Sequence, residues 1–257
     1  MPGPNQPALP GFFIGPPTPF RPVDALGNPK SAPGVGGAPL AAPTLRYVRK
    51  TGSDSNGGTS PADAWLTIGK ALTTVGSNTT VYVGAGVYRE TVSVTITPTS
   101  LVSIIGDVTG AFTGDAGMVQ LTAYLTNDKT APSATALLNL NGKSNMAFQN
   151  IMFVGGSPAR IVQATTVTSQ NISFKPCSFV GNAFTSGAPL ALSFSNAFGV
   201  PYNLMVDGCT FLMCGGRSSG GIINISATGS AVRRLTTIWV SRSGTASSAP
   251  ELRLSPQ

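Results

Sequence analysis

Alternating apolar and polar positions recur four times along the second half of the chain. The four copies begin at Asn145, Asn171, Asn203 and Ala231, so successive starts lie 26, 32 and 28 residues apart. A period of this length with strand-type alternation predicts one coil of a solenoid per repeat. A second short apolar strand comes before each copy and after the last, at Leu138/Leu140, Ile161/Val162, Leu190/Leu192/Phe194, Ile223/Ile225 and Leu252/Leu254.

Stacked coils place equivalent side chains in rows, because no coil can bury its own inner face without a neighbour. We expect an inward aromatic row, an aliphatic row and a mixed row: Phe153, Phe179, Phe211 and Trp239; Met146, Ile172, Leu204 and Val232; Ile151, Cys177, Cys209 and Thr237. Cys177 and Cys209 would then be adjacent buried thiols. We expect packed free cysteines rather than a disulfide or a metal site, because the chain has three cysteines and no histidine.

Residues 46–107 show a different pattern, in which short strands surround one amphipathic helix. Ser60 is a candidate helix cap, and a proline follows it at the first helical position. Trp65, Ile68 and Leu72 fall on one face of that helix. A resemblance to the start of pectin-lyase-like right-handed β-helix proteins is carried by the letters YVRKTGSDSNGGTSPADAWLTIGKAL and then TVYVGAGVYRE. In that family the amphipathic helix covers the first coil.

The resemblance implies an all-β fold, a single-stranded right-handed parallel β-helix with an N-terminal capping helix. Together with the repeats it predicts about five or six coils. We place an extended proline-rich arm at residues 1–44 and the β-helix domain at residues 45–257. The resemblance is specific for fold and nearly silent on function, because this fold carries lyases, hydrolases, adhesins and phage tailspikes or other virion parts.

The arm holds twelve of the chain's 21 prolines, so it can neither pair as a central strand nor continue as a helix. Its expected state is extended, polyproline-like chain. Phe12, Phe13, Ile14 and Phe20 are spaced apolar anchors within it, whereas disordered tails are usually poor in aromatics. Two interpretations stay open: an arm that docks through these four residues on another subunit, and a free tail.

Positive charge is concentrated towards the C-terminus. The net charge is +7, and residues 130–257 carry eight basic and two acidic residues. This half either binds an acidic partner, with Arg217, Arg233 and Arg234 as candidate contacts, or is simply solvated. No run of Lys and Arg with interleaved aromatics indicates a nucleic-acid groove. Because secretory-signal and membrane-span patterns are both missing, we expect cytoplasmic synthesis without a signal peptide and no membrane contact.

Residues suited to catalysis are few in this sequence. The lack of histidine excludes Ser–His and Cys–His nucleophiles. A glycosidase needs two facing carboxylates, yet Asp207 is the one carboxylate in the aligned strands, where its equivalents are Gln149, Lys175 and Leu235. We expect Lys175 and Asp207 to form an ion pair between coils. A lyase would need a base near a cation, and no acidic cluster is present to hold calcium. The sequence therefore predicts no catalytic residue, no metal and no cofactor.

These features together favour a non-enzymatic structural protein of a bacteriophage virion. A capsid decoration (cement) or head-fibre protein, docked through its N-terminal arm, fits them best. Its partners would be major capsid or tail subunits, and it would self-associate, as a trimer in many viral assemblies that it resembles. The alternative is a tailspike or secreted β-helix protein that binds or cleaves a polysaccharide. A bacterial surface adhesin is a third class, for which the sequence offers no export route.

Overall fold

A computed structural model describes residues 41–123, 136–155, 160–164, 171–181, 190–196, 203–212, 214, 223–227, 232–236 and 239–241. Contacts divide the chain into residues 1–41 and 42–257, and the account below concerns the second part. The boundary between arm and β-helix domain expected at residue 44 stays a prediction. The arm anchors Phe12, Phe13, Ile14 and Phe20 lie outside the described residues, as do Arg217, Thr237, Leu252 and Leu254.

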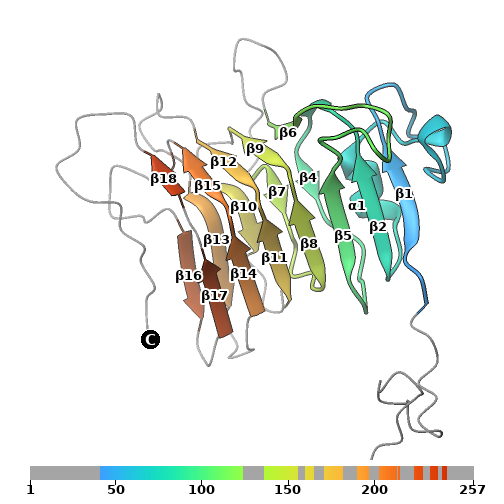
Figure 1. Cartoon of the computed structure of the whole chain (residues 1–257). Coiled ribbons are helices and arrows are strands. Elements are labelled where there is room, and N and C mark those ends of the chain that lie inside the picture. The colour runs from blue at the N-terminus through green and yellow to red at the C-terminus, as the bar shows by residue number, and fades with distance from the viewer. Residues whose placement is uncertain are drawn as a thin grey trace, which may run out of the picture. The chain divides into compact units, whose positions relative to one another are not determined.

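The described strands form three sheets in which every pairing is parallel (Figure 1). The first sheet, in spatial order, contains β1 (Thr44–Val48), β2 (Thr79–Val83), β5 (Val102–Gly106), β8 (Met146–Gln149), β11 (Ile172–Lys175), β14 (Asn203–Asp207) and β17 (Val232–Thr236). The second contains β3 (Gly86–Arg89), β6 (Val119–Thr122), β9 (Met152–Val154), β12 (Ser178–Val180), β15 (Thr210–Leu212) and β18 (Trp239–Ser241). The third contains β4 (Val92–Ser93), β7 (Leu138–Asn139), β10 (Arg160–Ala164), β13 (Leu190–Asn196) and β16 (Ile223–Ala227).

Each coil of the chain gives one strand to each sheet in turn. Five coils from β2 to β16 are complete, and β17 and β18 begin a sixth. Parallel strands need long crossovers, and here each crossover is the rest of the coil. The expected right-handed parallel β-helix of about five or six coils is therefore confirmed.

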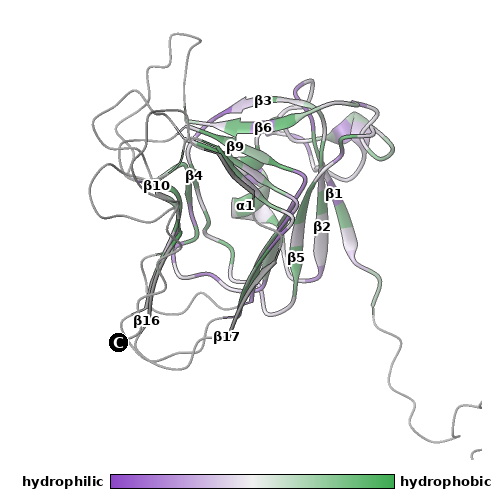
Figure 2. Cartoon of the chain, turned by 60° about the vertical axis from the view of Figure 1, so that its left-hand side comes forward, coloured by the Kyte–Doolittle hydropathy of each residue, from purple (hydrophilic) through white to green (hydrophobic). Residues whose placement is uncertain are grey.

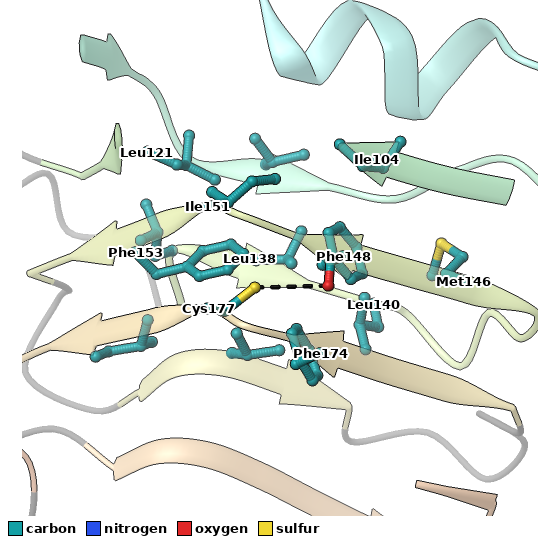
Figure 3. Close-up of a cluster of buried hydrophobic side chains, with 14 of the residues drawn as sticks. Ile104, Leu121, Leu138, Leu140, Met146, Phe148, Ile151, Phe153, Phe174 and Cys177 are labelled. Carbon is teal, nitrogen blue, oxygen red and sulfur yellow. Dashed lines mark hydrogen bonds between the residues drawn. The ribbon is translucent and has the colours of Figure 1, made fainter. Parts of the chain in front are cut away.

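Aromatic rings fill the middle of the core in two stacked rows. Figure 3 shows three of these rings, those of Phe148, Phe153 and Phe174. Phe148 stacks on Phe174 with ring centroids 5.3 Å apart. Phe179 stacks on Phe153 at 5.2 Å and on Phe211 at 4.9 Å. The two rows meet edge to face, as between Phe174 and Phe179 at 5.5 Å, which is a favoured arrangement of aromatic pairs. The inward row expected from the repeats is confirmed for Phe153, Phe179 and Phe211.

The last member of that row was predicted wrongly. Val240 stands opposite Phe211, and Trp239 stands one position earlier, opposite Thr210. A one-residue shift of register exchanges the two faces of a strand. The shift affects both strands of the last repeat, β17 and β18. The observed register sets apolar Leu235 opposite buried Val206, where the expected alignment would set an arginine. In the observed register Val232 pairs with Asn203, Arg233 with Leu204 and Thr236 with Asp207.

The three cysteines are buried free thiols. The Cys177 thiol lies 3.5 Å from the carbonyl oxygen of Phe148, as Figure 3 shows. Cys209 is 3.4 Å from the carbonyl of Phe174. The backbone N–H of Cys177 in turn points at the Cys209 sulfur, 3.4 Å away. Burial raises the pKa of Cys177. Because the three cysteines are buried and free, the expectation of packed free thiols is confirmed.

A row of asparagine amides runs along the turns that lead into the first sheet. Asn171 Nδ2 donates to Asn145 Oδ1 at 2.9 Å, and Asn203 Nδ2 donates to Asn171 Oδ1 at 3.2 Å. Asn145 and Asn171 have φ values of 60° and 54°, in the left-handed region that asparagine tolerates better than most residues. The amide at the start of three repeats therefore both shapes the turn and links neighbouring coils.

The capping helix is shorter than expected and begins later. Ser60 caps a three-residue 3₁₀ helix, η1 (Pro61–Asp63). The α-helix α1 (Ile68–Thr74) has Thr67 as its cap, because Asp54 accepts hydrogen bonds from the N–H groups of Leu66 and Thr67 and holds both outside the helix. Trp65 bridges to β1 instead of joining the helix.

The first sheet extends one strand beyond the others, and α1 contacts both β1 and β4 at this end (Figure 2). Among the described residues, no helix has the length and hydropathy of a membrane span.

Candidate functional site

The first sheet has an outer face, made of the side chains that alternate with its core residues, and Figure 1 looks onto this sheet. The strand register of the sheet aligns these side chains into two rows that cross the strands. The first row is Tyr47, Tyr82, Ile105, Gln149 and Lys175. Asp207 ends the neighbouring strand β14, one position after Val206, which pairs with Phe174 of β11. The second row is Leu45, Thr80, Ser103, Ala147, Ser173 and Met205. Among the strands whose side chains are described, β1 to β14, aromatic residues thus occupy one end of the outer face and charged residues the other.

Two opposite charges stand on neighbouring strands at the charged end. Lys175 is exposed and Asp207 is half-buried, on neighbouring strands β11 and β14. The expected ion pair between them is not formed: within the described part of the chain, Arg49–Asp115 is the ion pair present. An exposed pair gains little because holding two long side chains together is unfavourable in entropy. Both groups are therefore available to a ligand.

Three rings form the aromatic end of the outer face. Phe112, from the loop after β5, stacks on Tyr82 with centroids 3.8 Å apart and planes 5° from parallel. Tyr82 in turn neighbours Tyr47 at 6.2 Å. Phe112 keeps 47% of its surface exposed, so one ring face is covered and much of the rest meets solvent. Aromatic side chains with this much exposure are candidate contact points.

The loop that carries Phe112, residues 107–118, is held by two carboxylates. Asp107 accepts hydrogen bonds from the N–H groups of Phe112 and Thr113 at 2.8 and 2.7 Å. Burial alone would raise the pKa of Asp107, but these hydrogen bonds outweigh it and hold the pKa below its usual value. Asp115 receives two hydrogen bonds from Arg49, both of 2.7 Å, and they lower its pKa. A bidentate pair of this kind fixes geometry as well as adding energy.

The other carboxylates of the N-terminal region also accept hydrogen bonds within the fold. Asp54 accepts from the Thr67 hydroxyl at 2.8 Å in addition to the two N–H groups described above. Asp63 accepts from the Thr59 hydroxyl at 2.9 Å, which lowers its pKa. Glu90 accepts from the N–H groups of Ile68 and Gly69 at 2.8 and 2.9 Å, yet burial raises its pKa. These carboxylates stabilise turns and the helix start.

No group of three or more His, Cys, Asp or Glu side chains is arranged to hold a metal ion among the residues that the structure describes. Arg233 and Arg234 lie on β17 by their backbone positions. Sequence reasoning missed Phe112, whose loop carries no repeat. It also missed Tyr47 and Tyr82, although the pair Tyr-Val recurs in β1 and β2 with the valine buried, a signal that could have placed both tyrosines outward.

The sequence matches no protein-family model. A search of curated proteins also finds no match. Among solved structures, the fold is similar to that of a rhamnogalacturonan lyase, with a TM-score of 0.52 and 14% sequence identity. The similarity covers 77% of this chain and 51% of the lyase, so the chain spans about half the length of that structure. At this identity the similarity shows the fold alone, and that fold agrees with the parallel β-helix expected from the sequence.

The expectation that the chain is not an enzyme is contradicted by this similarity to a lyase. The error lies in the reaction types that the sequence was taken to exclude. A missing histidine and a missing carboxylate pair argue against nucleophilic triads and two-carboxylate hydrolysis. They do not argue against proton abstraction beside a carboxylate, which needs one base and one cation. The outer face carries both, in Asp207 and Lys175.

Proposed function

We propose that this chain binds an acidic polysaccharide along the outer face of the first sheet and cleaves it by elimination. The observation that carries the proposal is the exposed, unpaired Lys175 beside the Asp207 carboxylate on the neighbouring strand. The fold shared with a rhamnogalacturonan lyase supports it. A uronic-acid unit presents a carboxylate to the lysine and an acidic C–H to the aspartate, so one sugar unit satisfies both groups.

The reaction assigns one role to each side chain. The Lys175 ammonium pairs with the sugar carboxylate and makes the hydrogen on the adjacent ring carbon more acidic. The Asp207 carboxylate takes that proton as general base. The electron pair left behind forms a double bond to the next ring carbon, and the bond from that carbon to the glycosidic oxygen breaks. The departing oxygen takes a proton from water, and Asp207 returns its proton to solvent.

Elimination fits the outer face better than hydrolysis does. A glycoside hydrolase needs two carboxyl groups flanking the scissile bond. In the described part of the outer face Asp207 is the single carboxylate. The described carboxylates of the N-terminal region accept hydrogen bonds that hold turns and loops. The arrangement therefore offers one base and one cation rather than an acid pair.

The test is an elimination assay on the full chain with polygalacturonate, rhamnogalacturonan and alginate as probes. Each cleavage creates a conjugated double bond that is followed by ultraviolet absorbance. We expect absorbance to rise with at least one polymer, and the rate to fall by about a hundredfold or more in Asp207→Asn, the range typical of removing a general base. Lys175→Ala should lose binding and rate together.

Lys143→Ala is the matched control, because Lys143 lies in the turn before β8 and not on a strand of the first sheet. It should cleave at the wild-type rate. The proposal is wrong if the wild-type chain neither binds nor cleaves any of the three polymers. Reducing ends that appear without the double bond would instead show hydrolysis and remove Asp207 from its assigned role.

We also propose that the chain acts as part of a bacteriophage particle, in the manner of a tailspike, as a homo-oligomer attached to other virion proteins. The support is the proline-rich N-terminal segment with its four apolar anchors, Phe12, Phe13, Ile14 and Phe20. Mass spectrometry of purified particles, with antibody labelling in electron micrographs, tests this location. Particles that lack the chain would contradict it, and the elimination assay would be unaffected.

A further inference from the structure

We infer that Phe112 and Tyr82 form a second, uncharged sugar subsite at the far end of the outer face, which makes binding depend on the length of the polysaccharide. This inference rests on the proposed function, because it assumes a sugar chain anchored at Lys175. The occupant would be the apolar C–H face of a sugar ring, which packs on the electron-rich face of an aromatic ring. This sugar ring belongs to a different unit of the polymer from the unit that contacts Lys175.

The geometry of Phe112 favours a binding role over a structural one. Its ring is 47% exposed although it stacks on Tyr82. The loop does not need the ring for its shape, because the Asp107 carboxylate holds the backbone N–H of Phe112 and Asp115 is fixed by Arg49. Stacking on Tyr82 sets the ring orientation before any ligand arrives. A ring fixed in advance loses little entropy on binding.

The distance between the two ends of the outer face suits a sugar chain. Tyr82, Ile105, Gln149 and Lys175 stand on four successive strands of the first row. Three strand spacings of about 4.8 Å separate Tyr82 from Lys175, roughly 14 Å along the helix axis. One extended sugar unit is about as long as one strand spacing. A chain of about four units would therefore reach from the lysine to the rings.

The surface between the two ends carries polar groups beside the apolar side chains of Ile105 and Ala147. Small, half-buried side chains form the second row there, and three of them carry hydroxyl groups: Thr80, Ser103 and Ser173. Gln149 adds an amide in the first row. Such groups can hydrogen-bond sugar hydroxyls without blocking a chain that lies across the strands. The surface is therefore continuous from the charged end to the aromatic end.

The experiment measures affinity against chain length, with polygalacturonate oligomers from dimer to octamer. It uses the full chain carrying Asp207→Asn so that the oligomers stay intact, and calorimetry as the readout. We expect affinity to rise steeply at about the tetramer, as the spacing of the two ends requires. Adding Phe112→Ser should remove that rise, which corresponds to about a tenfold loss for the longer oligomers, and leave the shorter ones unchanged.

Two further variants separate the possible failures. Val87→Ser removes an apolar side chain of comparable exposure from the second sheet, and the length dependence should survive it. Lys175→Ala should weaken oligomers of every length. If Lys175→Ala weakens binding but Phe112→Ser leaves the length dependence intact, the subsite is wrong and the proposed function stands. If neither variant changes binding, both are wrong.

Discussion

Two regions of the same β-helix are stabilised by different interactions. In the N-terminal region, residues 44–123, carboxylates bind the backbone of loops and turns, as Asp107 does for the loop of Phe112. In the central coils, residues 145–212, rings and amides bind their equivalents on the next coil, as Phe179 does with Phe211. The first region relies on hydrogen bonds to individual carboxylates, and the second relies on repetition.

The difference follows from what each coil has as a neighbour. A central coil finds the same side-chain pattern on both sides, so identical residues can stack and need no special partner. The N-terminal coils end against a helix and carry long turns, whose backbone N–H groups need acceptors of their own. The carboxylates serve there as acceptors. Asp207, in the central coils, has no such turn to hold, which is why it is a better candidate for chemistry.

The largest expected effect lies in the central coils. Phe179→Ala removes a fully buried ring that stacks on rings both above and below it. We expect the free energy of unfolding to fall by ~3–5 kcal/mol, the range for deleting a buried aromatic side chain. Urea unfolding followed by circular dichroism measures it. Phe112→Ala is the matched control in the N-terminal region and should lose less than about 1 kcal/mol, because its ring is half exposed.

A smaller loss is expected for the carboxylate that holds the N-terminal loop. Asp107→Asn keeps the shape but removes a charged acceptor from a site that is 4% exposed, and we expect a loss of about 2–3 kcal/mol. The folded state holds the pKa of Asp107 below its ordinary 3.8. The contribution of Asp107 is therefore present above that pH and is lost as the pH falls below it. The urea unfolding curves of the wild type and of Asp107→Asn should therefore converge at acidic pH.

Glu90→Gln should show the opposite dependence of stability on pH in the same region. Burial raises the pKa of Glu90 above its ordinary 4.5, so the carboxylic acid is favoured in the folded state. Its contribution is complete below 4.5 and is lost as the pH rises through the raised value. The stability difference between wild type and Glu90→Gln should therefore shrink towards neutral pH, where the difference for Asp107→Asn grows. Equal pH trends for the two variants would contradict the assigned environments.

Periodicity was enough to predict the central coils. The rows of Phe153, Phe179 and Phe211 follow from the spacing of the repeats, because stacking requires equivalent positions to meet. The register of the last repeat failed at Trp239, since two adjacent apolar residues, Trp239 and Val240, leave the alternation ambiguous by one position. The prediction of the helix start failed because a hydrogen bond to Asp54, which precedes the helix in a non-repeating loop, sets it.

The candidate site was less predictable than the fold. Asp207, Lys175 and Gln149 were aligned from the repeats, and the register confirms the alignment of Lys175 with Gln149. Whether two aligned charges pair depends on rotamers, which the sequence does not show. Phe112 reaches the outer face through a loop held by Asp107, and no periodic signal marks such a contact. Function in this fold resides in such non-repeating additions.

The smallest effect concerns the asparagine row, and two variants of Asn171 separate its two contributions. Asn171→Gly keeps the left-handed backbone, φ 54°, but removes the amide bonds to Asn145 and Asn203, so we expect a loss of about 1 kcal/mol. Asn171→Ala removes the same bonds but, unlike glycine, keeps a Cβ in that conformation without the polar group that lets asparagine tolerate it, which adds about 1 kcal/mol. Urea unfolding of both variants measures the difference. If glycine is as destabilising as alanine, the amide row matters more than the turn, and side-chain repetition stabilises the surface of the central coils as it does their core.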